Sequence, residues 1–336
     1  MELQGPFLVI PTKRGAVPNL TPAQANAILE PSERILATSV FEAMDFVKPC
    51  VEAGMPLAEY SGLRGYKTVL TLRSSFHGLH ASASSTDSAV AGDSDKGRSV
   101  VSVDKWREVV KATQPALAVA IHESVPLSEP LSKRRRVAAA RSEAWLIRSR
   151  EAADVGCPIL PSISVAGPDR GGYIDAVPRG ENSHEFYQTL QELKLSPGKC
   201  TMCIAPSITA LLVAMASNVS LMECPLPWAL AEKGVALLLP VDDAMATMQQ
   251  PLAPLLDLND NVFALDINPI AQGCDCFTCK RHCRAYVHHL LTVREMNSDI
   301  LLVMHNLTQV VRLVRAYRCV DASTRETLVS RVASAL

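Results

Sequence analysis

The sequence predicts an α/β protein built on a parallel sheet, and two patterns carry the prediction. Short apolar, β-branched runs alternate with helical stretches along most of the 336 residues, which is the element order of α/β folds. The runs are also apolar throughout, as strands are when both faces of a sheet are buried. About eight runs fit a (β/α)8 barrel better than a doubly wound sheet, although counting strands does not separate the two folds.

The individual elements follow from these runs and from the helical periodicity between them. The predicted strands are Phe7–Ile10, Val69–Leu72, Ser99–Val103, Ala116–Ile121, Ile159–Ser164, Gly172–Val177, Thr201–Ala205, Ser220–Glu223 and Val235–Val241. The predicted helices are Pro22–Leu29, Lys105–Ala112, Lys133–Ala152, Ser183–Leu193 and Ile208–Ser217.

Two shifts in composition suggest how the chain is organised. Residues 80–97 are rich in Ser, Ala, Asp and Gly, so we expect a disordered loop that buries too little apolar surface to offset its ordering entropy. A Pro- and Asp-rich stretch near residues 249–260 precedes a cysteine cluster. We therefore predict a barrel body at residues 1–248 and a metal-binding subdomain with C-terminal helices at residues 249–336.

The bulk composition limits the classes of function. Hydrophobic residues make up 48% of the chain, and 33 basic against 34 acidic residues give a net charge of −1. Nothing global marks a nucleic-acid binder, so RNA contacts would need local basic patches. Candidates for such patches are residues 132–136 with Arg141, Arg148 and Arg150 on one helix, and Arg312, Arg315 and Arg318 on the last helix.

Several familiar signals are missing from the sequence. No GxGxxG loop, Walker motif or GxSxG elbow occurs, and no apolar run approaches the ~18 residues of a transmembrane helix. The opening residues, MELQGP, lack the basic start and apolar run of a secretory signal. We therefore expect a reducing compartment, where ten cysteines indicate a metal or free thiols and not disulfides.

The strongest chemical signal is a CxCxxC cluster formed by Cys274, Cys276 and Cys279. Zinc prefers four tetrahedral nitrogen or sulfur ligands, and a tight turn can place three thiolates around one ion. The fourth ligand must come from elsewhere; the nearby candidates are His282, Cys283, His288, His289 and His305. Four filled positions would leave no room for substrate, so we expect a structural zinc ion.

The helical pattern that follows the cysteine cluster slightly favours His305 as the fourth ligand. Ile300, Met304, Leu307, Val311 and Val314 form one apolar stripe at helical spacing, and His305 flanks it. His305 should therefore point inward. His288 and His289 are adjacent on a helix and cannot both face one ion.

These residues resemble the zinc-binding segment of the tRNA-guanine transglycosylase family. That family has CxCxxC, then Arg-Ala-Tyr-x-His-His-Leu, matched here by Arg284–Leu290, and then His-Asn, matched by His305 and Asn306. The opening FLVIPTKRGAVPNL, residues 7–20, is also similar to the family's first strand and turn. The resemblance spans most of the chain and is weakest over residues 30–100.

The resemblance implies a (β/α)8 TIM barrel with the zinc segment inserted near its end. It also implies that Cys274, Cys276, Cys279 and His305 are the zinc ligands. Family members that act as catalytic subunits use two aspartates, and here Glu223 and His122 stand at those places. Residues 171–178 likewise depart from the segment that cups the base, and with Asp175 they resemble the family's accessory paralogues.

We therefore expect a non-catalytic accessory subunit without a catalytic residue of its own. It would form a heterodimer with a catalytic subunit through the helix around Tyr286–Leu290, and would support exchange of guanine for queuine at the wobble base of tRNA. The alternatives are a divergent transglycosylase that uses Glu223, and a stand-alone zinc-stabilised RNA-binding module. The resemblance implies tRNA as a partner through the complex, no DNA, and a cytoplasmic location; a peripheral place at the mitochondrial outer membrane, or the nucleus, is the alternative.

Overall fold

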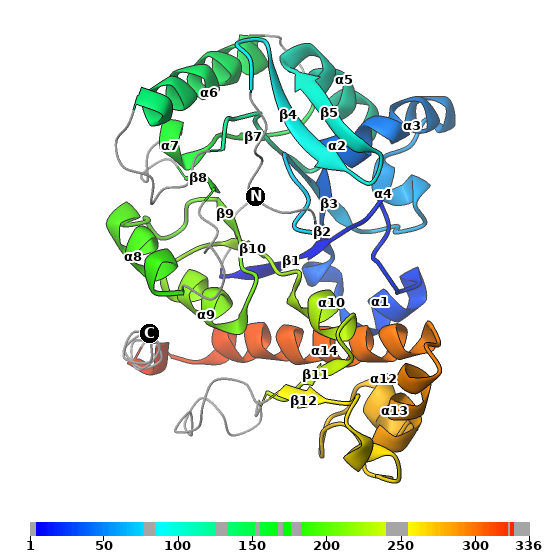
Figure 1. Ribbon diagram of the computed structural model, residues 1–336. Coiled ribbons are helices and arrows are strands. Elements are labelled where there is room, and N and C mark those ends of the chain that lie inside the picture. The colour runs from blue at the N-terminus through cyan, green and yellow to red at the C-terminus, as the bar shows by residue number, and fades with distance from the viewer. Residues whose placement is uncertain are drawn as a thin grey trace.

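A computed structural model of the chain describes residues 5–76, 85–124, 133–151, 155–166, 171–175, 183–239, 255–321 and 323–325. Its centre is a parallel sheet ringed by helices (Figure 1). The eight strands of this sheet are β1 (Phe7–Pro11), β2 (Ile35–Ser39), β3 (Lys67–Thr71), β6 (Leu117–Val119), β7 (Ile159–Leu160), β8 (Gly172–Ile174), β9 (Thr201–Ile204) and β10 (Leu221–Glu223).

The sheet curls into a nearly closed barrel. Its order is β7-β6-β3-β2-β1-β10-β9-β8, with every neighbour parallel. The two end strands meet where Ser162 bridges Tyr173 and the amide of Tyr173 donates to the carbonyl of Pro161 at 2.7 Å. Consecutive strands are therefore neighbours all the way round, which confirms the predicted (β/α)8 barrel and excludes the doubly wound sheet.

Both faces of the strands are buried, which explains why the strand sequences are apolar throughout. Val9, Tyr173, Met202 and Leu221 belong to one cluster with other alternate residues of the strands. Their neighbours in sequence, such as Leu8, Cys203 and Met222, pack with the surrounding helices. Glu223 has the same parity along β10 as Leu221, so the pleat directs it towards the barrel axis.

Helices follow the strands around the outside of the barrel. They are α1 (Pro22–Ile28), α2 (Val40–Ala43), α3 (Val47–Ala53), α4 (Leu57–Tyr60), α5 (Val103–Thr113), α6 (Lys133–Glu151), α7 (Ile163–Ala166), α8 (Ser183–Leu193), α9 (Ile208–Ala216), α10 (Leu226–Ala231) and α14 (Asn297–Cys319), with the 3-10 turns η1 (Pro31–Glu33) and η2 (Met44–Phe46). The start of α1 is fixed by a capping box between Thr21 and Gln24.

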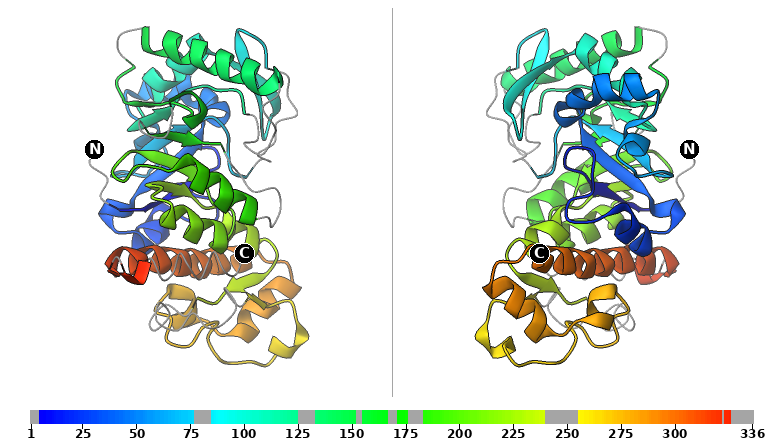
Figure 2. Two further views of the ribbon diagram at one scale, coloured as in Figure 1. Left: turned by 90° about the vertical axis from the view of Figure 1, so that its left-hand side faces the viewer. Right: turned by 90° about the vertical axis from the view of Figure 1, so that its right-hand side faces the viewer.

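Helix α14 joins the barrel to a C-terminal segment that lies beyond it. This segment contains β11 (Val235–Leu237) paired with β12 (Leu255–Asp257), the turn η4 (Asn261–Phe263), and the helices α12 (Phe277–Arg281) and α13 (Arg284–Thr292). Helix α14 contacts α1, α10 and β1 on the barrel side, and α12, α13 and β11 on the other. In the two side views the helix accordingly lies between the barrel and the segment (Figure 2).

The serine-rich stretch contradicts one prediction. Strands β4 (Ala89–Ser94) and β5 (Gly97–Ser102) form an antiparallel hairpin where a disordered loop was expected at residues 80–97. Val90 and Val101 are fully buried, and Gly92 lies against the ring of Phe41 with no room for a Cβ atom. The hairpin is thus ordered by packing on α2; residues 80–84 of the predicted loop lie outside the described residues.

Other element predictions change in their details. The predicted strands at Ser99–Val103 and Val235–Val241 correspond to β5 and β11, which lie outside the barrel sheet. Strand β2 completes the eight and was missed. The predicted strand Ile159–Ser164 ends at Leu160, and α7 begins at Ile163. The domain boundary expected near residue 249 falls outside the described residues.

Arg315 and Arg318 of α14, which the sequence offered as candidate RNA contacts, bind groups of this chain. Glu33 is buried, and the Nε atom of Arg315 donates to its Oε1 at 2.9 Å. Arg318 lies 3.3 Å from the same oxygen, donates to the carbonyl of Pro6, and stacks on the ring of Phe7. Similarly, Arg141 of α6 pairs with Asp87 and Glu123.

Among the helices of the described residues, none combines the length and the apolar character that a membrane span requires.

The Glu33 cluster yields a prediction about stability. Substitution Arg315→Ala leaves a buried carboxylate with one fewer partner, and should lower the free energy of unfolding by about 2 kcal/mol. Chemical denaturation measures the change. The control is Arg136→Ala, because Arg136 is exposed on α6 and its loss should cost less than about 0.5 kcal/mol. Equal effects of the two substitutions would contradict the role given to Glu33.

Candidate metal centre and barrel mouth

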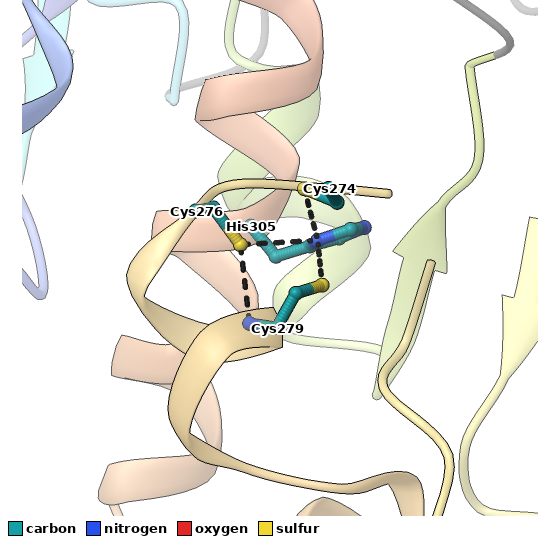
Figure 3. Close-up of side chains that lie close together, drawn as sticks. All are labelled: Cys274, Cys276, Cys279 and His305. Carbon is teal, nitrogen blue, oxygen red and sulfur yellow. Dashed lines mark hydrogen bonds between the residues drawn. The ribbon is translucent and has the colours of Figure 1, made fainter. Parts of the chain in front are cut away.

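Four side chains predicted as zinc ligands come together between α12 and α14. Cys274 precedes α12, Cys276 is its N-cap, and Cys279 lies within it. His305 lies at the middle of α14 and has no exposed surface. The four ligand atoms all lie within 4.8 Å of one another, and the side chains converge from the two elements on one point (Figure 3).

The distances match a tetrahedral site. The Nδ1 atom of His305 is 3.9 Å from the sulfur of Cys274, 3.5 Å from that of Cys276 and 3.3 Å from that of Cys279. Zinc bonds of about 2.3 Å to sulfur and 2.0 Å to nitrogen imply ligand separations of roughly 3.5 Å across a tetrahedron. The cluster can therefore hold a metal ion of the size and ligand preference of zinc.

Hydrogen bonds around the cluster leave its nitrogen and sulfur atoms in forms that can bind a metal ion. The Nε2 atom of His305 lies 2.9 Å from the carbonyl of Leu237. It must carry the proton there, which leaves Nδ1 with a lone pair that faces the three sulfurs. The Nε2 atom of Gln309 donates to the sulfur of Cys274 at 3.3 Å. Hydrogen bonds from Cys276 and then Cys279 lower the pKa of Cys274, so the cluster favours a thiolate.

Asn306, the residue that follows His305, binds the backbone of β11. The Oδ1 atom of Asn306 accepts from the amide of Leu237 at 2.8 Å, and its Nδ2 atom donates to the carbonyl of Val235 at 3.0 Å. Gln309 accepts from the amide of Leu239 at 3.1 Å. Three side chains of α14 thus bind the backbone of β11 and its continuation, so the metal centre and the last strand are positioned by the same helix.

The other candidates for the fourth ligand lie outside the cluster. The Nδ1 atom of His288 hydrogen bonds to the carbonyl of Leu258 at 2.8 Å. His282 stacks on Tyr286 with ring centroids 5.0 Å apart, and His289 is exposed. Cys283 is the N-cap residue of α13. Among the described residues, only His305 meets the three cysteines.

Helix α13 corrects part of the predicted partner surface. Val287 has no exposed area and Leu290 is 5% exposed, because both pack in the core of this chain. Tyr286 is 40% exposed. An acidic substitution at Val287 would therefore disrupt the chain itself and would not test partner binding. Tyr286 is a large hydrophobic residue of this helix that a partner can reach.

Glu223 and His122, which the resemblance places at the positions of the family's catalytic aspartates, lie at the carboxyl ends of the barrel strands, where barrel enzymes place their active sites. Glu223 ends β10 with 1% of its surface exposed. The amide of Ser75 donates to its Oε1 atom at 3.3 Å. Its Oε2 atom has no hydrogen-bond partner among the described groups. Burial, with a smaller contribution from Glu42, raises the pKa of Glu223 to about 7, although hydrogen bonds from Ser75 oppose the shift.

His122 and Asp175 form a pair on the other side of this barrel mouth. The Nδ1 atom of His122 lies 2.9 Å from the carbonyl of Ala120, and its Nε2 atom lies 3.3 Å from Oδ2 of Asp175. Burial alone would raise the pKa of Asp175, but the bond to His122 and further interactions with Ser124 and Arg73 lower it overall.

The segment at residues 171–175 is fixed by close packing. Gly171 has a φ of +76°, in the left-handed region, and a Cβ atom there would overlap the carbonyl of Cys200. At Gly172 it would overlap the backbone of Pro161. Tyr173, which follows, points into the barrel and its ring lies 5.4 Å from that of His122. The two glycines let β8 fit between its neighbours, and the tyrosine fills the interior; residues 176–178 lie outside the described residues.

A (β/α)8 barrel with a cysteine–histidine cluster near its C-terminus is the combination that the sequence resemblance predicted. Comparison with known proteins identifies the same family. The sequence model of the family described as queuine tRNA-ribosyltransferase matches residues 1–320. The chain therefore belongs to this family, which confirms the resemblance found in the sequence.

Particular relatives refine the comparison. A protein of Anopheles gambiae named queuine tRNA-ribosyltransferase accessory subunit 2 is 24% identical, over 95% of this chain and 80% of its own length. A protein of the same name from Drosophila grimshawi is 23% identical over 91% of this chain and 80% of its own. A queuine tRNA-ribosyltransferase of Prochlorococcus marinus (strain MIT 9303) is 28% identical over 51% of this chain and 41% of its own.

The raised pKa of Glu223 predicts how stability depends on pH. The folded chain binds a proton between pH 4.5 and about 7 that the unfolded chain has released, so stability falls as the pH rises through this range. Relative to Glu223→Gln, the natural chain should lose about 3 kcal/mol of unfolding free energy between pH 5 and pH 8. Denaturation curves at the two values measure the loss.

The control for this pH effect is Glu192→Gln, because Glu192 is exposed on α8. This variant should follow the natural chain at both pH values. A difference between the natural chain and Glu223→Gln that does not change with pH would contradict the raised pKa.

Proposed function

We propose that this chain is a non-catalytic accessory subunit that pairs with a catalytic queuine tRNA-ribosyltransferase subunit. The complex would replace guanine with queuine at the wobble position of tRNA, which would reach this chain through the complex. The observation that carries the proposal is the alignment with accessory subunits, which runs over 95% and 91% of the chain in two relatives. The aligned catalytic relative from Prochlorococcus marinus matches 51%.

The burial and the raised pKa of Glu223 support a non-catalytic role for the chain. By resemblance this residue stands at the place of the catalytic nucleophile. A nucleophilic carboxylate must be ionised and must reach the substrate, but Glu223 is buried and its pKa is raised to about 7. One of its oxygens holds the amide of Ser75. A divergent transglycosylase that uses Glu223 is therefore the weaker hypothesis.

Part of the basic residues weakens the other alternative, a stand-alone RNA-binding module. Arg315 and Arg318 bind Glu33, and Arg141 binds Asp87 and Glu123. Cations paired with carboxylates of their own chain contribute little to phosphate binding, whereas Arg136 and Arg150 of α6 are exposed and stay candidates for it. The predicted cytoplasmic location stays a prediction.

The exposed hydrophobic side chains of the C-terminal segment support the proposal that a protein partner binds there. Eight of the thirteen large hydrophobic side chains found exposed among the described residues lie between residues 255 and 296: Leu255, Val262, Leu265, Ile267, Phe277, Tyr286, Val293 and Met296. Exposed apolar groups gathered in one segment are typical of an interaction surface. Within it Phe277, His282 and Tyr286 form a run of ring contacts, and aromatic residues are common at the centres of interfaces.

We also propose that Cys274, Cys276, Cys279 and His305 bind one structural zinc ion. The ion would tie α12 to α14, and its binding energy would become folding energy. The purified chain should carry about one zinc per molecule. Cys276→Ser and His305→Ala should each abolish most of the zinc and lower the melting temperature, because each removes a ligand. Elemental analysis and thermal melting measure the two effects.

The exposed His289→Ala serves as the matched control and should retain full zinc. Full zinc in His305→Ala, with loss of zinc in His288→Ala, would show that the fourth ligand was assigned to the wrong histidine.

The partner proposal predicts both an activity and an interface. The isolated chain should not exchange guanine in tRNA, whereas adding it should activate the catalytic subunit. Tyr286→Ala should weaken binding of the catalytic subunit at least tenfold, because it removes an exposed ring from the proposed centre of the interface. The measurements are a base-exchange assay and titration calorimetry.

Tyr60→Ala is the control, because Tyr60 is 44% exposed on α4, in the barrel. It should bind as the natural chain does. Base exchange by the isolated chain that Glu223→Gln abolishes would replace the accessory hypothesis with the enzyme hypothesis.

A further inference from the structure

A cavity of about 350 Å³ lies beside the barrel mouth, between the loop after β1, the segment after β3, α10 and the first turns of α14. Trp228 and Phe76 supply its aromatic lining, with ring centroids 5.9 Å apart and planes at 84°. The indole nitrogen of Trp228 donates to the carbonyl of Pro18 at 2.9 Å. The cavity thus has a rigid aromatic side.

The position of Phe76 depends on Glu223. The amide of Ser75, the residue before Phe76, donates to the Glu223 carboxyl group at 3.3 Å. This bond ties the segment after β3 to the end of β10, three residues before the start of α10. Glu223 is therefore a positioning residue for the cavity, which gives a structural role to a side chain that the proposed function leaves without chemistry.

The charges of the cavity are unbalanced. Glu232, just after α10, and Asp299, in the first turn of α14, both line it. Neither carboxylate has a cationic partner among the described residues. Lys13 also lines the cavity, but its ammonium group lies 3.3 Å from Asp95. Burial, and then the charge of Glu232, raise the pKa of Asp299, so the two acids repel each other.

We propose that this cavity receives a basic side chain, lysine or arginine, from the catalytic partner subunit. Two carboxylates would neutralise its charge, and Trp228 and Phe76 would supply an aromatic lining for its apolar stem. Val293 and Met296, which are 50% and 70% exposed, lie in the turn that leads from α13 into α14. The cavity therefore adjoins the apolar surface through which the partner is proposed to bind, and the inference rests on that proposed function.

The test is the affinity of the chain for purified catalytic subunit, measured at two salt concentrations. The double variant Glu232→Gln, Asp299→Asn keeps the size of both side chains and removes their charge. Its dissociation constant should rise at least tenfold at low salt, mainly through faster dissociation, and should depend less on salt than that of the natural chain. Glu232→Lys, at an exposed position, should weaken binding further.

The matched control is Glu192→Gln on α8, which should bind as the natural chain does. If the double variant and Glu232→Lys both bind like this control, the inference is overturned while the proposed function stands. If the natural chain itself does not bind the catalytic subunit, the proposed function and the inference fail together.

Discussion

The hydrogen bond between His305 and the carbonyl of Leu237 is the interaction on which the architecture of this chain depends. It fixes the ring of His305, so that one nitrogen faces three cysteines while the other holds β11. Because His305 lies in the middle of α14, the same helix carries the candidate metal centre, anchors the last strand through Asn306 and packs against the barrel. A metal ion bound there would stabilise the helix that closes the barrel and not only a local loop.

At the barrel mouth, three buried side chains make contacts within the chain. Glu223 holds the segment after β3, His122 pairs with Asp175, and Tyr173 fills the interior beside them. His122 and Asp175 bind each other, and Glu223 accepts from the amide of Ser75, at the strand ends where a barrel enzyme would place its active site. The chain thus has the family's fold and a cysteine–histidine cluster, while these side chains make contacts within the chain.

Local patterns in the sequence were sufficient for a buried parallel sheet and for the three cysteines, whereas the resemblance to a family was needed to decide for the barrel and for His305. Apolar strands mark a sheet buried on two faces, and three cysteines within six residues mark a metal site. The hairpin was missed because its composition resembles a disordered loop, although the Asp95-Lys96-Gly97 turn between Ala-Val-Ala and Ser-Val-Val was a usable hairpin signal. The role of Arg315 could not be predicted, because Glu33 lies 282 residues away in sequence.

X-ray absorption at the zinc edge of the purified chain tests the central claim most directly, since it reports the atoms bound to the metal. The structure predicts about three sulfur neighbours near 2.3 Å and one nitrogen near 2.0 Å, with no light-atom water ligand. In His305→Ala the nitrogen shell should change or the zinc should be lost. A spectrum with four sulfur neighbours, or one that His305→Ala leaves unchanged, would contradict the account.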